Sequence, residues 1–73
     1  MKLTRIAKSA VSGNSGCPAV YTTDDPDTVV IQGNILDAES RGNLQQVLDD
    51  EDAVSIPTET ILRAAKMIEE QQR

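Results

Sequence analysis

The chain has 73 residues and a formal net charge of −5, and it contains one tyrosine but no tryptophan, phenylalanine or histidine. That length fits a single small domain over residues 1–73 and excludes a large enclosed active site. A small core without large aromatic residues, with one cysteine and no cluster of zinc ligands, leaves oligomerisation as the expected additional source of stability.

Charge is spread unevenly along the chain. Residues 1–20 carry three cations and no acid, whereas residues 21–60 carry ten acids against Arg41 alone. The three cations are Lys2, Arg5 and Lys8. An acidic body repels phosphate backbones, so direct nucleic-acid binding is not expected, and binding through these cations is the weakest alternative. A solvated acidic surface explains most of the charge, and it suits a basic protein partner.

The N-terminal segment, residues 1–16, is expected to be weakly ordered. The apolar spacing in residues 1–11 fits both a helix and a strand, so we interpret this part as a weak edge strand or a tail. Residues 12–16 contain only serine, glycine and asparagine, which is typical of a flexible loop. The cations interrupt any apolar run, so no signal peptide is expected, and no segment is long enough to span a membrane.

A β-hairpin is predicted over residues 17–33. Its first strand covers residues 17–23, and the turn at residues 24–27 places Pro26 where its fixed φ suits a type I bend. Its second strand, residues 28–33, holds the only three consecutive β-branched aliphatic residues of the chain. Because such residues pack well on a pleated surface, we predict that this strand is the centre of the sheet. Its expected core residues are Val29, Val30 and Ile31.

A first helix is predicted over residues 38–48. Asp37 is a good N-cap, and Glu39 lies in the first turn, where a negative charge favours the helix dipole. Gly42 weakens the helix by up to about 1 kcal/mol relative to alanine. The acids of residues 49–52 oppose the dipole and end the helix. Its apolar positions, at helical spacing, are Leu44, Val47 and Leu48.

A short strand and a second helix complete the chain. The strand covers residues 53–56, and the helix, residues 59–71, is capped by Thr58 and supported by the i,i+4 pair of Glu59 and Arg63. The helix carries an apolar stripe formed by Ile61, Leu62, Ala65 and Ile68. The order β-β-α-β-α predicts an α+β fold, a small, mainly antiparallel sheet with two helices packed on one face.

Residues 8–20, Lys-Ser-Ala-Val-Ser-Gly-Asn-Ser-Gly-Cys-Pro-Ala-Val, followed by a β-branched strand, resemble a family of very small actinobacterial proteins. This is a family of unknown function, often encoded beside helix-turn-helix regulators, and it includes the bald-B developmental regulator. The resemblance covers residues 8–33 and implies regulation through protein partners and a dimeric state. The chain departs from the family pattern because Ile6 stands where an aromatic residue is usual, and because it has an additional strand–helix unit.

The candidate chemistry of the side chains points away from catalysis. Cys17 is the one strong nucleophile, and without a histidine to lower its pKa we interpret it as a small apolar residue at the start of a strand. The acidic runs at residues 24–27 and 49–52 lack the alternating ligands and the glycine of a calcium-binding EF-hand loop. We therefore expect no enzymatic activity, cofactor or metal, and a cytoplasmic protein with reduced Cys17.

The apolar stripe of the last helix is the candidate interaction surface. We interpret Ile61, Leu62, Ala65 and Ile68 mainly as core, with a share that could form a dimer face. The leading hypothesis is a non-enzymatic protein–protein interaction module with a regulatory role, acting as a homodimer on a protein partner such as a helix-turn-helix regulator. The alternative is a small accessory subunit of a metabolic enzyme.

Overall fold

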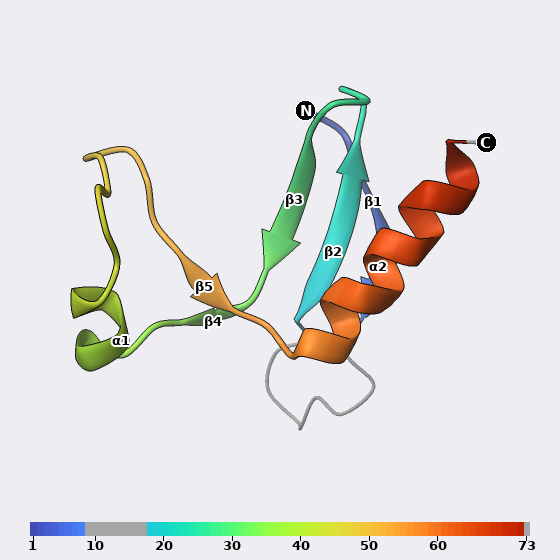
Figure 1. The fold of residues 1–73 in the computed structure, drawn as a ribbon. Coiled ribbons are helices and arrows are strands. Elements are labelled where there is room, and N and C mark those ends of the chain that lie inside the picture. Colours follow the sequence, from blue (N-terminus) through green and yellow to red (C-terminus); the bar gives the residue numbers. More distant parts are fainter. Residues whose placement is uncertain (9–17, 73) are drawn as a thin grey trace.

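The computed structural model describes residues 1–8 and 18–72, and Figure 1 shows a sheet with one helix against it and an extension to one side. The elements are β1 (Leu3–Lys8), β2 (Ala19–Thr23), β3 (Val29–Gln32), β4 (Asn34–Ile35), α1 (Ala38–Gly42), β5 (Val54–Ser55) and α2 (Thr58–Gln71). The predicted α+β class with a small antiparallel sheet is confirmed.

The main sheet has the antiparallel order β1-β2-β3, so β2 is its central strand. The prediction that residues 28–33 form the centre is wrong, since β3 lies at an edge of the described sheet. Val20 of β2 is only 2% exposed, whereas Val29 and Ile31 of β3 are 45% and 40% exposed. A run of β-branched residues predicts a strand, because such side chains pack well on a pleated surface. It does not predict how many neighbouring strands or helices cover that strand.

The N-terminal segment contributes a strand to this sheet. β1 pairs with β2 along its length, with a shift in register between Arg5 and Ala7. The edge-strand interpretation therefore holds for Leu3–Lys8, and the weak order of residues 1–16 stays a prediction. The remainder of the expected flexible segment, residues 9–16, lies outside the described residues, as does Cys17.

The hairpin of β2 and β3 is confirmed, together with its turn. The Thr28 backbone N–H donates to the Asp25 carbonyl oxygen at 3.1 Å, which closes a four-residue turn with Pro26 in its second position. The Thr23 hydroxyl reinforces this turn by donating to the Asp25 carbonyl oxygen at 2.8 Å. The ladder that follows pairs Thr22 with Val29 and Val20 with Ile31.

The core lies between α2 and one face of the sheet. Buried Ala7, Val20 and Ala64 meet there, and partly buried Ile6 and Ile56 pack around them. The helix packs against β1 and β2. Small residues at the contact let the helix approach the sheet closely, but they also make the core small for a chain of this length.

The helix α2 matches its prediction apart from its first residue. It begins at Thr58 with Pro57 as N-cap and without a side-chain capping hydrogen bond, so the predicted Thr58 cap is wrong. The predicted pair is present, since Arg63 Nη2 lies 3.4 Å from Glu59 Oε2. Both side chains are close to half exposed, so this pair adds little to the free energy of unfolding.

Residues 34–55 form an extension from the sheet, which we call the arm (Figure 1). Its base is a two-stranded antiparallel ladder in which Asn34 pairs with Ser55 and Ile35 with Val54. Its helix α1 is fully exposed and lies away from the main sheet, so the prediction of two helices on one face holds for α2 alone. The arm therefore folds largely on its own contacts.

The helix α1 is much shorter than predicted. The Asp37 cap is confirmed, since its Oδ1 accepts the Ser40 backbone N–H at 2.7 Å. The helix ends at Gly42, and Asn43 caps its carbonyl end. Val47 and Leu48 are 43% and 64% exposed, so a longer helix would gain little packing energy from them, and the low helix propensity of glycine decides the end.

Candidate functional site

The structure divides the predicted stripe of α2 between two environments. Ile61 and Leu62 are 36% and 66% exposed, Ala65 is exposed, and Ile68 is half-buried. The face toward the sheet is instead formed by Thr60 and Ala64, which are buried. The stripe therefore runs along the flank of the helix beside the core. Sequence periodicity missed the buried position of Thr60 because it is polar.

The opposite flank of α2 faces β1. Arg63 Nη2 donates a short hydrogen bond to the backbone oxygen of Lys8, the last residue of β1. On the other side, Ile68 and Gln72 line a pocket together with Val29 of β3. Ile61, Ala65 and Ile68 therefore lie on the flank that is turned toward β3. Leu62, two residues from buried Thr60 and Ala64, lies on the outer side of the helix next to that flank.

The helix leaves the β3 part of the sheet largely uncovered. Ile31 pairs with buried Val20, and Val29 pairs with Thr22, so both side chains point to the face of the sheet on which α2 packs. Both are nevertheless more than a third exposed, because α2 lies over β1 and β2. We call the combined apolar region the α2–β3 surface, defined as Val29, Ile31, Ile61, Leu62, Ala65 and Ile68.

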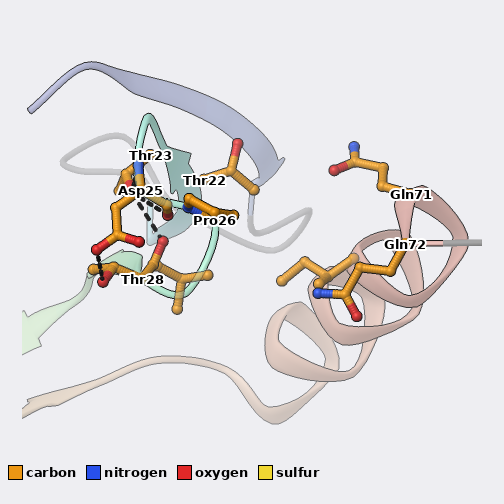
Figure 2. A pocket seen from close by; sticks show the side chains of 9 residues that line it. Thr22, Thr23, Asp25, Pro26, Thr28, Gln71 and Gln72 are labelled. Carbon is orange, nitrogen blue, oxygen red and sulfur yellow. Dashed lines mark hydrogen bonds between the residues drawn. The ribbon is translucent and has the colours of Figure 1, made fainter.

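A pocket of about 280 Å³ adjoins this surface, between the hairpin turn and the end of α2. Figure 2 shows the Thr22, Thr23 and Asp25 side chains on one side and Gln71 and Gln72 on the other. The volume is at the lower limit for a small-molecule site, and it suits a single side chain of a partner. Sequence reasoning missed this pocket, since it joins two segments that lie far apart in the chain, residues 22–29 and 68–72.

The one carboxylate in the pocket wall is engaged within its own turn. Asp25 accepts the Asp27 backbone N–H and the Thr28 hydroxyl, each at 2.9 Å. These two hydrogen bonds, the backbone one first, lower the pKa of Asp25 below its ordinary value. An ionised carboxylate that already accepts two donors stabilises the turn and is poorly placed to act as a general base.

The acidic run at residues 49–52 lies at the far end of the arm. Asp52 Oδ1 is 2.6 Å from Arg41 Nη1 and also accepts the Ala53 backbone N–H at 2.8 Å. The hydrogen bond from Arg41, followed by that from Ala53, lowers the pKa of Asp52. The pair joins the two sides of the arm, and among residues 1–8 and 18–72 no group of three metal-ligating side chains converges.

The three N-terminal cations lie on or beside β1. Lys2 precedes the strand, Arg5 lies within it and Lys8 ends it, and all three are exposed. Arg5 pairs with Tyr21, so it belongs to the sheet face opposite α2. This edge is the basic side of an otherwise acidic chain.

Comparison with known proteins adds no functional assignment. No protein-family model, curated protein or solved structure matches the chain. In the part of the chain that the structure describes, neither helix has the length and apolar character needed to cross a membrane. The functional argument therefore depends on the α2–β3 surface, the adjoining pocket and the arm.

Proposed function

We propose that this chain is a non-enzymatic protein–protein interaction module with a regulatory role, and that it acts as a homodimer in the cytoplasm. The observation that carries the proposal is the α2–β3 surface. Four of its aliphatic side chains are between 36% and 66% exposed, in a chain whose described core is made mostly of alanine and valine. Apolar residues placed together at the surface mark interaction sites in soluble proteins.

The chemistry of this surface supports binding. Alkyl side chains supply contact area but cannot transfer a proton or attack a substrate. The polar groups beside them are threonine hydroxyls, glutamine amides and the Asp25 carboxylate, which is held in its turn. Such an apolar centre with a polar rim is the usual composition of a protein interface.

A regulatory partner, such as a helix-turn-helix protein, is the further part of this proposal. It is supported by the resemblance of residues 8–33 to small actinobacterial proteins encoded beside such regulators. The alternative partner is a metabolic enzyme for which the chain would be an accessory subunit. The two are distinguished by what is bound to the α2–β3 surface in the cell.

Self-association is tested by sedimentation equilibrium of the wild type and of Leu62→Asp. Leu62 is 66% exposed, so the substitution should leave the fold intact and weaken the dimer at least about tenfold by burying a charge in an apolar contact. Gln32→Asp is the control, because Gln32 is exposed and pairs with Ala19, which places it on the sheet face opposite α2 and outside the α2–β3 surface. A wild type that is monomeric up to millimolar concentration would overturn the homodimer.

The partner is tested by photo-crosslinking in the native host. A photoreactive amino acid at position 62 should give the adduct of two copies of the chain and one specific adduct with another protein, and the same group at position 32 should give neither. A captured regulator would support the regulatory role, and a captured enzyme would favour the accessory-subunit alternative. Equal labelling from both positions would contradict the assignment of the α2–β3 surface.

A further inference from the structure

The chain exposes more surface than a compact protein of its mass. It exposes 5840 Å², against about 4,400 Å² expected for a folded monomer of 7.9 kDa. Its radius of gyration is 13.5 Å, against about 11 Å for a compact chain of this length. The excess of roughly 1,400 Å² is more than the 800 Å² or so that one partner buries in a standard interface.

Among the described residues, the arm is open to solvent. Its helix and its strands are exposed throughout, and it extends beyond the edge of the main sheet (Figure 1). It also carries apolar side chains that the rest of the chain leaves uncovered. Their exposed fractions are 88% for Ile35, 43% for Val47, 64% for Leu48 and 41% for Val54.

The arm nevertheless has a defined internal structure. The β4–β5 ladder fixes its base, the Asp37 cap fixes α1, and the pair of Arg41 and Asp52 joins its two sides. The Leu48 backbone N–H also donates to Glu51 Oε1 at 3.0 Å, which holds the segment after α1. A segment organised in this way can bind a partner without paying the full entropy of ordering.

Charge indicates which surface the arm fits. Residues 34–55 carry six acids and Arg41, a net charge of −5, so the rest of the chain is balanced at zero. Three of the six cations in that balanced part, Lys2, Arg5 and Lys8, lie on or beside β1 and are exposed. The chain thus carries an acidic surface and a complementary basic one on separate elements, which favours contact between two copies.

The positions of these elements are compatible with a two-fold dimer. The arm leaves the main sheet on the β3 side, and β1 forms the opposite edge (Figure 1). If two copies meet through their α2–β3 surfaces about a two-fold axis parallel to the strands, the β1 edge of each copy comes to the β3 side of the other. Each arm then lies beside the β1 edge of the other copy, and the contact occurs twice.

We propose that the arm is a dimer clasp: the arm of one copy docks on β1 and its cations in a second copy, and the reverse contact forms at the same time. This inference rests on the proposed homodimer and adds a second contact to it. The apolar residues of the arm would supply contact area, and the opposite charges would set its orientation. The binding partner of the arm is therefore another copy of the same chain.

A charge-swap experiment on the full chain tests the clasp. Sedimentation equilibrium at low salt is measured for the wild type, for an arm variant with Asp49→Lys and Asp50→Lys, and for a strand variant with Lys2→Glu and Arg5→Glu. These residues are exposed, and Asp52 with its Arg41 contact is left unchanged. Each variant should raise the dimer dissociation constant about tenfold or more, and less at high salt, where the charges are screened.

Combining both sets of substitutions in one chain gives the decisive measurement. Swapped charges are again complementary between copies, so the combined variant should recover most of the wild-type affinity. Unchanged affinity of the arm variant, with a dimer still disrupted by Leu62→Asp, would overturn the clasp and leave the homodimer standing. A wild type that never dimerises would overturn both proposals. If the arm variant and the strand variant each lose dimer affinity but the combined variant does not recover it, this result would also count against the clasp.

Discussion

Gly33 lies where β3 ends and the arm begins, and the backbone of β5 approaches it closely. A β-carbon at this position would overlap the Ser55 carbonyl oxygen and would lie 3.0 Å from Val54 Cγ2. The obstacle is a backbone atom, which cannot rotate away as a flexible side chain can. Glycine is therefore required at position 33 by close packing of two chain segments.

Gly33→Ala should lower the free energy of unfolding by about 1–3 kcal/mol, because the added methyl group must push the two strands apart. Gly42→Ala is the matched control, since a β-carbon there meets nothing within 4 Å. Alanine at the end of α1 should be neutral or stabilise by up to about 1 kcal/mol. Urea unfolding of both variants checks the difference, and equal effects would refute the close contact at Gly33.

Val20→Ala should cost about 2–3 kcal/mol, because Val20 is 2% exposed at the centre of the core. Val47→Ala removes the same atoms from a side chain that is 43% exposed, and it should cost less than about 1 kcal/mol. Urea unfolding in dilute solution, where any dimer is dissociated, measures both. A larger loss for Val47 would show that β2 is not the central strand of a stable core.

Acid should destabilise the hairpin turn through Asp25. Its folded-state pKa is depressed below the ordinary value of 3.8, so its contribution to stability is complete above that value. The contribution is lost as the pH falls through the folded-state pKa. Thermal melting between about pH 6 and pH 2 should therefore show a smaller acid-induced loss for Asp25→Asn than for the wild type. Equal acid-induced losses in Asp25→Asn and the wild type would show that the ionised Asp25 carboxylate does not stabilise the turn.

Elements differ in how far the sequence determines them. The hairpin, the Asp37 cap and most of α2 follow from local signals, namely turn residues, a capping side chain and helical spacing over four turns. The centre of the sheet and the length of α1 depend on which surfaces meet in three dimensions. Leu44 and Leu48 had helical spacing, but α1 ends before them because no other element covers it.

The candidate site shows the same division. Periodicity identified an apolar stripe on α2, but its exposure depends on how the helix is rotated against the sheet. Ala64, which was beside the predicted stripe, is buried, and Leu62 within the stripe is 66% exposed. Thr60 and the pocket at Asp25 could be found only from the arrangement of α2 over the hairpin.

The main sheet and α2 should fold without the arm. The core residues Ala7, Val20 and Ala64, with Ile6 and Ile56 around them, all lie outside residues 34–55. A variant in which a short Gly-Ser linker replaces the arm, residues 34–55, should therefore retain a cooperative thermal transition and the circular dichroism of a mixed α/β protein. A non-cooperative transition would show that the arm stabilises the core.

At the scale of the whole molecule, extents of 39 × 30 × 20 Å and a small core predict a monomer of low stability. A homodimer would raise the stability by covering the α2–β3 surface, and its melting temperature must then depend on concentration. We expect the midpoint to rise by several degrees between micromolar and millimolar protein. Differential scanning calorimetry over that range measures the effect, and a constant midpoint would indicate that the monomer is stable alone.

The contact between Gly33 and Ser55 also has an evolutionary consequence. The two ends of the arm lie side by side where they join the rest of the chain, which consists of the main sheet and α2. Insertions, deletions and substitutions within the arm need not disturb the core. The arms of duplicated genes could thus diverge while the main sheet and α2 are retained. If the arm selects the copy with which a chain pairs, such paralogues in one cell would form separate homodimers, and the arm would determine the specificity of dimerisation.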